Sequence, residues 1–236
     1  METGKSINLR INDYAQQGLY LTLKDSKKIA LTREHIEKSA SEYWSNPDKI
    51  PRNVKSAVDF QRCSFCPLKG KDEFCDAIRP VLPFLDVIDD YVSFDEVMAV
   101  YKEDKGRLLH VADTTMQEAL RYMSLLSLMQ YCRIGRVYWK YYMGIIPLIG
   151  GKEAAVRMYL NMYWAHKGNK EEIKSVISKF NGEIRVTSQN QVKRLSMICK
   201  SDAFMNAFVS TQAATEFLDM DIEKALESAF RRHDEA

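Results

Sequence analysis

The apolar residues of this chain follow one spacing near its start and a different spacing after about Thr114. Leu19, Leu21 and Leu23 are separated by single residues, and the same alternation occurs at Ile7, Leu9 and Ile11. A period of two is typical of strands that bury one face. We therefore predict a meander of three antiparallel strands over residues 6–31.

The rest of the first half mixes short helices with a second hairpin. Thr32 suits the N-cap of a helix over 33–45, and shorter helices are expected at 53–62 and 72–79. Residues 93–112 fit two patterns. Ser93 and Glu96 form a capping box that would start a helix, but a turn ending at Gly106 joins two strand-like runs, and we favour the hairpin.

The second half has the periodicity of helices. Thr115 and Glu118 form a capping box before a helix that ends near Cys132. Its expected inward positions are Met116, Leu120, Met123, Leu126 and Met129. Further helices are expected at 136–143, 152–166, 169–181, 190–209 and 212–231, with breaks at Gly168 and Gly182.

These patterns predict an α+β fold. A small antiparallel N-terminal sheet with short helices and a cysteine-rich loop is followed by an all-helical C-terminal bundle. The border lies near Asp113, which divides the chain into a mixed region 1–113 and a helical region 114–236, either as two units or as one continuous domain.

Composition narrows the class of protein. A hydrophobic content of 46% is enough for a large core, and a net charge of +2 provides no strong field toward nucleic acid or an anionic membrane. The first residues lack a signal-peptide pattern, and the longest apolar run is too short to span a bilayer. We expect a cytoplasmic protein without a membrane partner, in which an odd number of cysteines does not form a disulfide framework.

Three of the five cysteines lie close together, at Cys63, Cys66 and Cys75. Two thiolates separated by two residues can turn onto one ion, and a third can arrive from the next helix. Tetrahedral zinc needs a fourth ligand. Cys132 is the first choice, ahead of Cys199, His110 and His166. An iron–sulfur cluster also takes thiolates, and Pro67 after Cys66 is compatible with it, but we place zinc slightly ahead.

Two other interpretations of the cysteine cluster remain open. Nearby cations such as Arg62 and Lys69 lower thiol pKa values, so Cys63 and Cys66 can be a redox pair. Thioredoxin-type pairs, however, follow a strand and open a helix, whereas Pro67 and Gly70 predict a loop here. The cysteines can also be ordinary small apolar residues that happen to be neighbours.

A second segment invites a functional interpretation. Residues 133–142 interleave four aromatic residues with three cations, a pattern that can stack bases and neutralise phosphates. The simpler interpretation is a helix whose aromatics pack inward while its cations reach water, so nucleic acid is an unlikely partner.

The sequence as a whole predicts a metal-binding regulatory or interaction protein, with a protein as the expected partner. In it Cys63, Cys66, Cys75 and Cys132 hold zinc or an iron–sulfur cluster. The alternatives are a redox enzyme that uses an iron–sulfur centre or a reactive thiol, and a nucleic-acid-binding protein.

Overall fold

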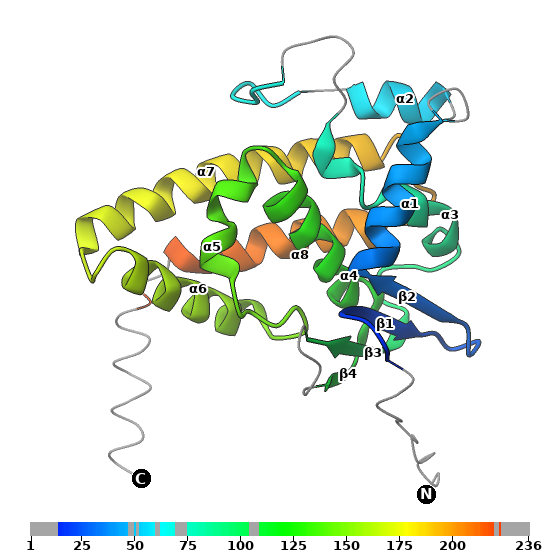
Figure 1. Ribbon diagram of the computed structural model, residues 1–236, viewed down its shortest axis with the longest axis horizontal. Helices are drawn as coiled ribbons and strands as arrows, with labels where there is room; N and C mark the ends of the chain where they lie inside the picture. Colours follow the sequence, from blue (N-terminus) through cyan, green and yellow to red (C-terminus); the bar gives the residue numbers. More distant parts are fainter. Residues whose placement is uncertain are drawn as a thin grey trace, which may run out of the picture.

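The computed structural model describes residues 14–46, 50, 52–59, 62–68, 75–103, 109–219 and 222. A four-stranded antiparallel sheet lies at one end of the molecule, and helices make up most of the rest (Figure 1). The predicted α+β class is confirmed. The strand expected around Ile7 to Ile11 falls outside the described residues.

The sheet is built from two hairpins. Strands β1 (Gly18–Thr22) and β2 (Lys28–Thr32) pair with each other, as do β3 (Glu96–Lys102) and β4 (Leu109–Thr115), in the order β2-β1-β3-β4. The hairpin favoured for residues 93–112 is thus confirmed. Val97 and Ala99 are both buried, which is the period of two that a strand with one inward face requires.

Several short helices lie between the first hairpin and the second. Helix α1 (Arg33–Ser45) begins as predicted, because the Thr32 hydroxyl accepts a hydrogen bond from the backbone N–H of His35 at 3.1 Å. Helix α2 spans Arg52–Asp59. Of the helix predicted at 72–79, residues 72–74 lie outside the described residues, and the described part contains a 3₁₀ turn, η3 (Asp76–Ile78). Pro80 prevents η3 from extending into a longer helix. A second 3₁₀ turn, η4 (Leu82–Phe84), leads into α3 (Leu85–Ile88).

The second half is helical, as predicted. Helix α4 (Met116–Leu126) continues as a π-helical turn, η5 (Ser127–Tyr131), and is followed by η6 (Gly135–Tyr138) and α5 (Trp139–Tyr142). Then come α6 (Gly151–Ala165), α7 (Lys170–Leu195), α8 (Ala203–Glu216) and η7 (Phe217–Asp219). In Figure 1, α7 is the long yellow helix that runs across the bundle beside α8.

Several helix-boundary predictions are wrong. The helix predicted at 190–209 is interrupted, because α7 ends at Leu195 and α8 begins at Ala203, and α8 continues past the start predicted at 212. Gly182 does not end a helix, because α7 runs unbroken through it and through Asn190. A glycine inside a helix costs only about 1 kcal/mol. The buried side chains of Phe180 and Ile184 lie on either side of Gly182, and their packing outweighs this cost.

The expected capping box at the start of α4 is also absent. The Thr115 side chain makes no capping hydrogen bond. Instead the N–H of Met116 donates to the Asp95 carbonyl at 2.8 Å, and the N–H of Gln117 donates to the Ser93 carbonyl at 3.0 Å. The turn before β3 therefore provides acceptors for the first backbone N–H groups of α4. These hydrogen bonds take the place of a side-chain cap.

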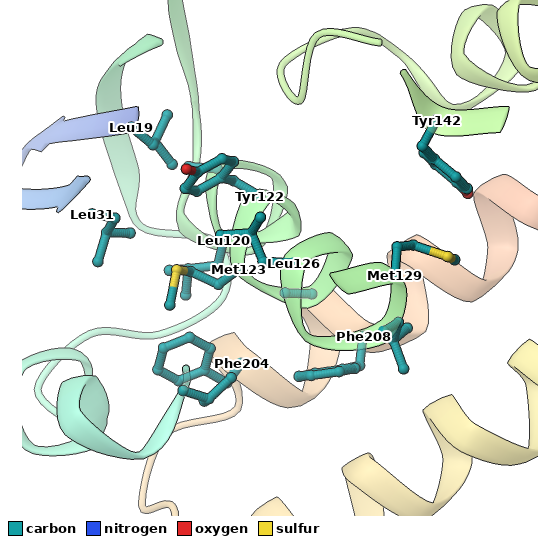
Figure 2. Packing of buried hydrophobic residues seen from close by; sticks show 14 of the residues in the cluster. Leu19, Leu31, Leu120, Tyr122, Met123, Leu126, Met129, Tyr142, Phe204 and Phe208 are labelled. Carbon is teal, nitrogen blue, oxygen red and sulfur yellow. The ribbon is translucent and has the colours of Figure 1, made fainter. Parts of the chain in front are cut away.

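One cluster of buried side chains joins the sheet to the helices. Leu19 and Leu31 come from the sheet, Leu120 and Met123 from α4, and Phe204 from α8 (Figure 2). The five inward positions predicted for this helix are all buried. Helix α4 thus lies between the sheet and α8, and its burial on both sides sets where its C-terminal end is placed.

We predict that Gly135 is required at the end of this helix. A Cβ atom at Gly135 would lie 1.7 Å from the carbonyl oxygen of Leu128 in η5, so Gly135→Ala must displace the backbone. We expect the free energy of unfolding, measured by urea denaturation, to fall by at least about 2 kcal/mol.

Gly182→Ala is the matched control, because a Cβ atom there meets no atom of the described residues within 4 Å. In the middle of α7 this change should raise the free energy of unfolding by about 0.5–1 kcal/mol. Equal effects of the two substitutions would contradict the close packing of Gly135 on η5.

Candidate metal centre

The first two cysteines lie in a tight turn. The backbone N–H of Cys66 donates to the carbonyl of Cys63 at 2.9 Å, so the chain folds back between them. This turn belongs to the loop 62–68, which lies above α7 in Figure 1. Residues 69–74, which lead to the third cysteine, lie outside the described residues.

The other two cysteines come from separate segments. Cys75 immediately precedes η3, and Cys132 ends the π-helical turn η5 in an extended conformation. An ion pair links these two segments, with Arg133 Nε 3.0 Å from Asp76 Oδ2. The Ser127 hydroxyl also donates to the carbonyl of Ala77. Two remote parts of the chain are thereby joined beside the cysteine loop.

All four cysteines line one cavity of about 20 Å³. Cys63, Cys66 and Cys75 pack against a small apolar cluster that consists of Ala77, Cys132 and Ile134. A volume of this size holds about one water-sized body. We call this space the cysteine cavity; it has room for an ion, but not for an organic molecule.

Helix α7 directs hydrogen-bond donors at two of the sulfur atoms. The amide nitrogen of Asn190 lies 3.3 Å from Cys63 Sγ. The amide nitrogen of Gln191 and Nη1 of Arg194 each lie 3.3 Å from Cys75 Sγ. Arg194 is 1% exposed. Donors of this kind favour the charged form of a sulfur and orient metal-bound ligands.

One acceptor in the wall of the cysteine cavity has no partner. Gln191 Oε1 is buried, and no group in the described part of the chain hydrogen-bonds to it. Buried polar atoms are nearly always paired in folded proteins. An orphaned acceptor beside four thiols fits a site whose polar environment is completed by something other than the polypeptide.

Burial keeps two of the ion-free thiols, Cys63 and Cys132, protonated. It raises the pKa of Cys132 to about 11, although the backbone N–H groups of Gly135 and Ile134 act in the opposite direction. Burial also raises the pKa of Cys63, against the hydrogen bond from Asn190 and the charge of Arg194. Without a cation these two groups are neutral at physiological pH.

The remaining ligand candidates lie elsewhere. Cys199 packs against the main core. His110 lies 3.5 Å from Glu103 in the β3–β4 hairpin. His166 is held between the Tyr141 hydroxyl at 2.7 Å and Glu172 at 3.0 Å. Of the four candidates for a fourth ligand, the structure places only Cys132 beside Cys63, Cys66 and Cys75.

The cysteines share a cavity without forming a complete set of ligands. Within the described residues, no three histidine, cysteine, aspartate or glutamate side chains form a group that could hold a metal ion. Thiol sites are rarely preformed in the absence of their ion, because protonated sulfurs neither attract nor need a common centre. Binding would therefore have to draw the sulfurs inward.

The donors on α7 were not assigned to this site from the sequence. In the sequence analysis these residues belong to the predicted helix 190–209 and are not predicted site residues. Asn190 and Arg194 are separated by four residues and so lie on one face of a helix. This spacing was visible in the sequence, but only the fold shows that the face meets the cysteines.

The aromatic and basic segment 133–142 behaves as its simpler interpretation predicts. Tyr138, Tyr141 and Tyr142 are buried, so their rings are not available to stack bases. Arg136 and Lys140 are exposed, and Lys140 Nζ lies 4.8 Å from the centre of the Tyr141 ring. The segment packs inward while its cations reach the surface.

Two findings concern the environment of the protein. All five cysteines are free thiols. None of the helices in the described part of the chain combines the length and apolar character needed to cross a bilayer.

We predict that Arg194 is required for stability, because its guanidinium is buried and donates to Cys75 Sγ. Arg194→Leu should lower the free energy of unfolding by about 2–4 kcal/mol, since it leaves buried acceptors without a donor. Arg185→Leu is the control. Arg185 lies on the same helix but is exposed, 3.8 Å from Glu216, and its loss should change stability by less than about 0.5 kcal/mol. Urea denaturation of both variants measures the difference, and equal losses would contradict this role.

Comparison with known proteins identifies a family but no activity. No curated protein and no solved structure matches the chain. A family model described as "Domain of unknown function (DUF6901)" matches residues 24–233, which include strands β2, β3 and β4, the cysteine cavity and the helical bundle. Because the match covers most of the sequence, the chain belongs to this family.

Proposed function

We propose that Cys63, Cys66, Cys75 and Cys132 bind a metal as thiolates. Zinc is the first choice, and an iron–sulfur cluster is the alternative. The observation that carries this proposal is that four cysteines from three separate chain segments line one small cavity. Zinc accepts four thiolates in a tetrahedron, and the size of the cavity favours a single ion.

The charge around the cavity supports bound thiolates. Four thiolates around Zn²⁺ carry a net charge of −2, which is costly to bury without nearby positive charge. Arg194 supplies a buried cation at 3.3 Å from Cys75 Sγ, and Asn190 and Gln191 add neutral donors. A cation would also replace the protons that burial keeps on Cys63 and Cys132.

A site with four protein ligands leaves no open position for a substrate, so the metal would act structurally. It would join the loop 62–68 to η3 and to the end of η5, next to the face of α7 that carries Arg194. We infer a cytoplasmic regulatory or interaction protein in which metal loading controls whether this loop is ordered. Five free thiols fit a reducing compartment.

An iron–sulfur redox protein is the second candidate. Hydrogen bonds to cluster sulfurs are one of the features that set a reduction potential, and α7 provides three donors. A cluster is larger than one ion, so it would require the loop 62–68 to move outward.

Elemental analysis with an absorption spectrum, on protein purified without oxygen, tests the proposal. About one zinc per chain and a colourless sample support the first choice. Iron with acid-labile sulfide and a brown colour support the alternative. The absence of both metals from freshly purified protein would refute the proposal.

We predict that Cys66→Ser loses the metal and lowers the melting temperature by about 5–10 °C, because binding free energy contributes to folding. Cys66 accepts none of the hydrogen bonds from α7, so the substitution removes a ligand with little other change. Cys199→Ser, away from the cavity, should keep the metal. A Cys66→Ser protein with full metal content and an unchanged melting curve would contradict the assignment.

A further inference from the structure

A second, larger cavity lies where the sheet meets α1, α4 and α5. Its volume is about 350 Å³, within the range of pockets that bind small organic molecules. Four aromatic residues line it: Tyr101 from β3, Tyr122 from α4, and Trp139 and Tyr142 from α5. We call it the aromatic cavity. None of its lining residues is a cysteine, so it is distinct from the cysteine cavity.

The π-helical turn lies between the two cavities. Leu126 and Gln130 line the aromatic cavity, and Cys132, immediately after the turn, lines the cysteine cavity. π-Helical turns inside α-helices occur frequently at functional sites, because the extra residue in the turn redirects side chains. In this helix the turn places Gln130 on the aromatic cavity and Cys132 on the cysteine cavity.

Tyr122 contributes a hydroxyl group to the residues that line the aromatic cavity. The Tyr122 side chain is 7% exposed and projects from α4 toward the sheet (Figure 2). No group in the described part of the chain hydrogen-bonds to its hydroxyl, and its ring centre lies 5.9 Å from that of Tyr101. Burial raises the pKa of Tyr122, so the hydroxyl remains protonated and can donate.

Arg33 supplies positive charge to the same cavity. Its Nε donates to Glu37 Oε1 at 2.9 Å, which is the one hydrogen bond of its guanidinium to a described residue. The two Nη groups therefore remain as donors. Its backbone N–H donates to the Gln17 carbonyl at 3.2 Å, which joins two lining residues of the cavity. The carboxylate of the lining, Glu103, lies 3.5 Å from His110.

Trp139 and Gln130 carry further donors at the aromatic cavity. Neither the indole N–H of Trp139 nor the side-chain amide of Gln130 is hydrogen-bonded to a described residue. An indole and a guanidinium can only donate. Together with the Tyr122 hydroxyl, these groups can donate hydrogen bonds to a ligand that carries acceptors.

We propose that the aromatic cavity binds a small planar aromatic carboxylate. Its ring would pack among Tyr101, Tyr122 and Trp139, whose faces favour stacked or edge-on contacts with another ring. The guanidinium of Arg33 would form an ion pair with its carboxylate, because the planar set of N–H groups matches the two carboxylate oxygens. The Tyr122 hydroxyl would donate to a ring substituent or to the carboxylate.

Isothermal titration calorimetry of the full chain, purified with its native metal, tests this proposal. The probes are 4-hydroxybenzoate and indole-3-carboxylate, each compared with its uncharged carboxamide. We expect at least one acid to bind with a Kd below about 1 mM, and its amide to bind about tenfold more weakly or not at all. Failure of both acids to bind at about 5 mM would refute the proposal, whatever metal the cysteines hold.

Substitutions locate the bound acid. Arg33→Met should weaken binding about tenfold or more, and Tyr122→Phe about threefold or more. Arg157→Met is the matched control, because Arg157 also pairs with a glutamate four residues away, at 2.8 Å, but lies on α6 outside the cavity. Melting curves check that each variant is folded. An affinity that both cavity variants leave unchanged would mean that the acid binds elsewhere, and would overturn the assignment.

Discussion

The structure depends on the burial of α4 on two sides. Met116, Leu120 and Met123 are fully buried between the sheet and α8, so the helix can neither rotate nor slide without exposing apolar surface. The Ser124 hydroxyl also donates to the Ala207 carbonyl of α8 at 3.2 Å. Since both cavities lie near the C-terminal end of this helix, this packing fixes the walls of both.

Close packing at the end of α4 fixes one wall of the cysteine cavity. The π-helical turn and the close approach of Gly135 to Leu128 leave little freedom in the backbone around Cys132. Two cysteines of the loop 62–68 pack against the small cluster of Ala77, Cys132 and Ile134. The cysteine cavity is thus formed between this loop and the end of α4.

Buried polar groups on α7 are the second constraint. Burying a guanidinium and two amides without partners would destabilise the fold. Gln191 and Arg194 line the cysteine cavity, and the amide of Asn190 donates to Cys63 Sγ beside it. Their donors meet sulfur atoms, which are weak acceptors as thiols and strong acceptors as thiolates. The donors on α7 are thus better satisfied by charged sulfurs than by neutral ones, whereas burial opposes the charge on Cys63 and Cys132 as long as no cation is bound. The proposed metal would supply the balancing positive charge.

Elements with a local signal can be predicted from the amino-acid pattern alone. Alternation at Leu19 and Leu21, the Thr32 cap and the apolar stripe of α4 correctly predicted the first hairpin, α1 and the buried face of α4. The sequence also indicated that Cys63 and Cys66 share a turn. Tertiary structure decided what local pattern could not. Packing on both sides of Gly182 kept α7 continuous, and the turn before β3 replaced the predicted cap at Thr115. The fold also brought Asn190 and Arg194 to the cysteines and Arg33 to Tyr122, because these residues are remote in sequence and only the packing of the helices makes them neighbours.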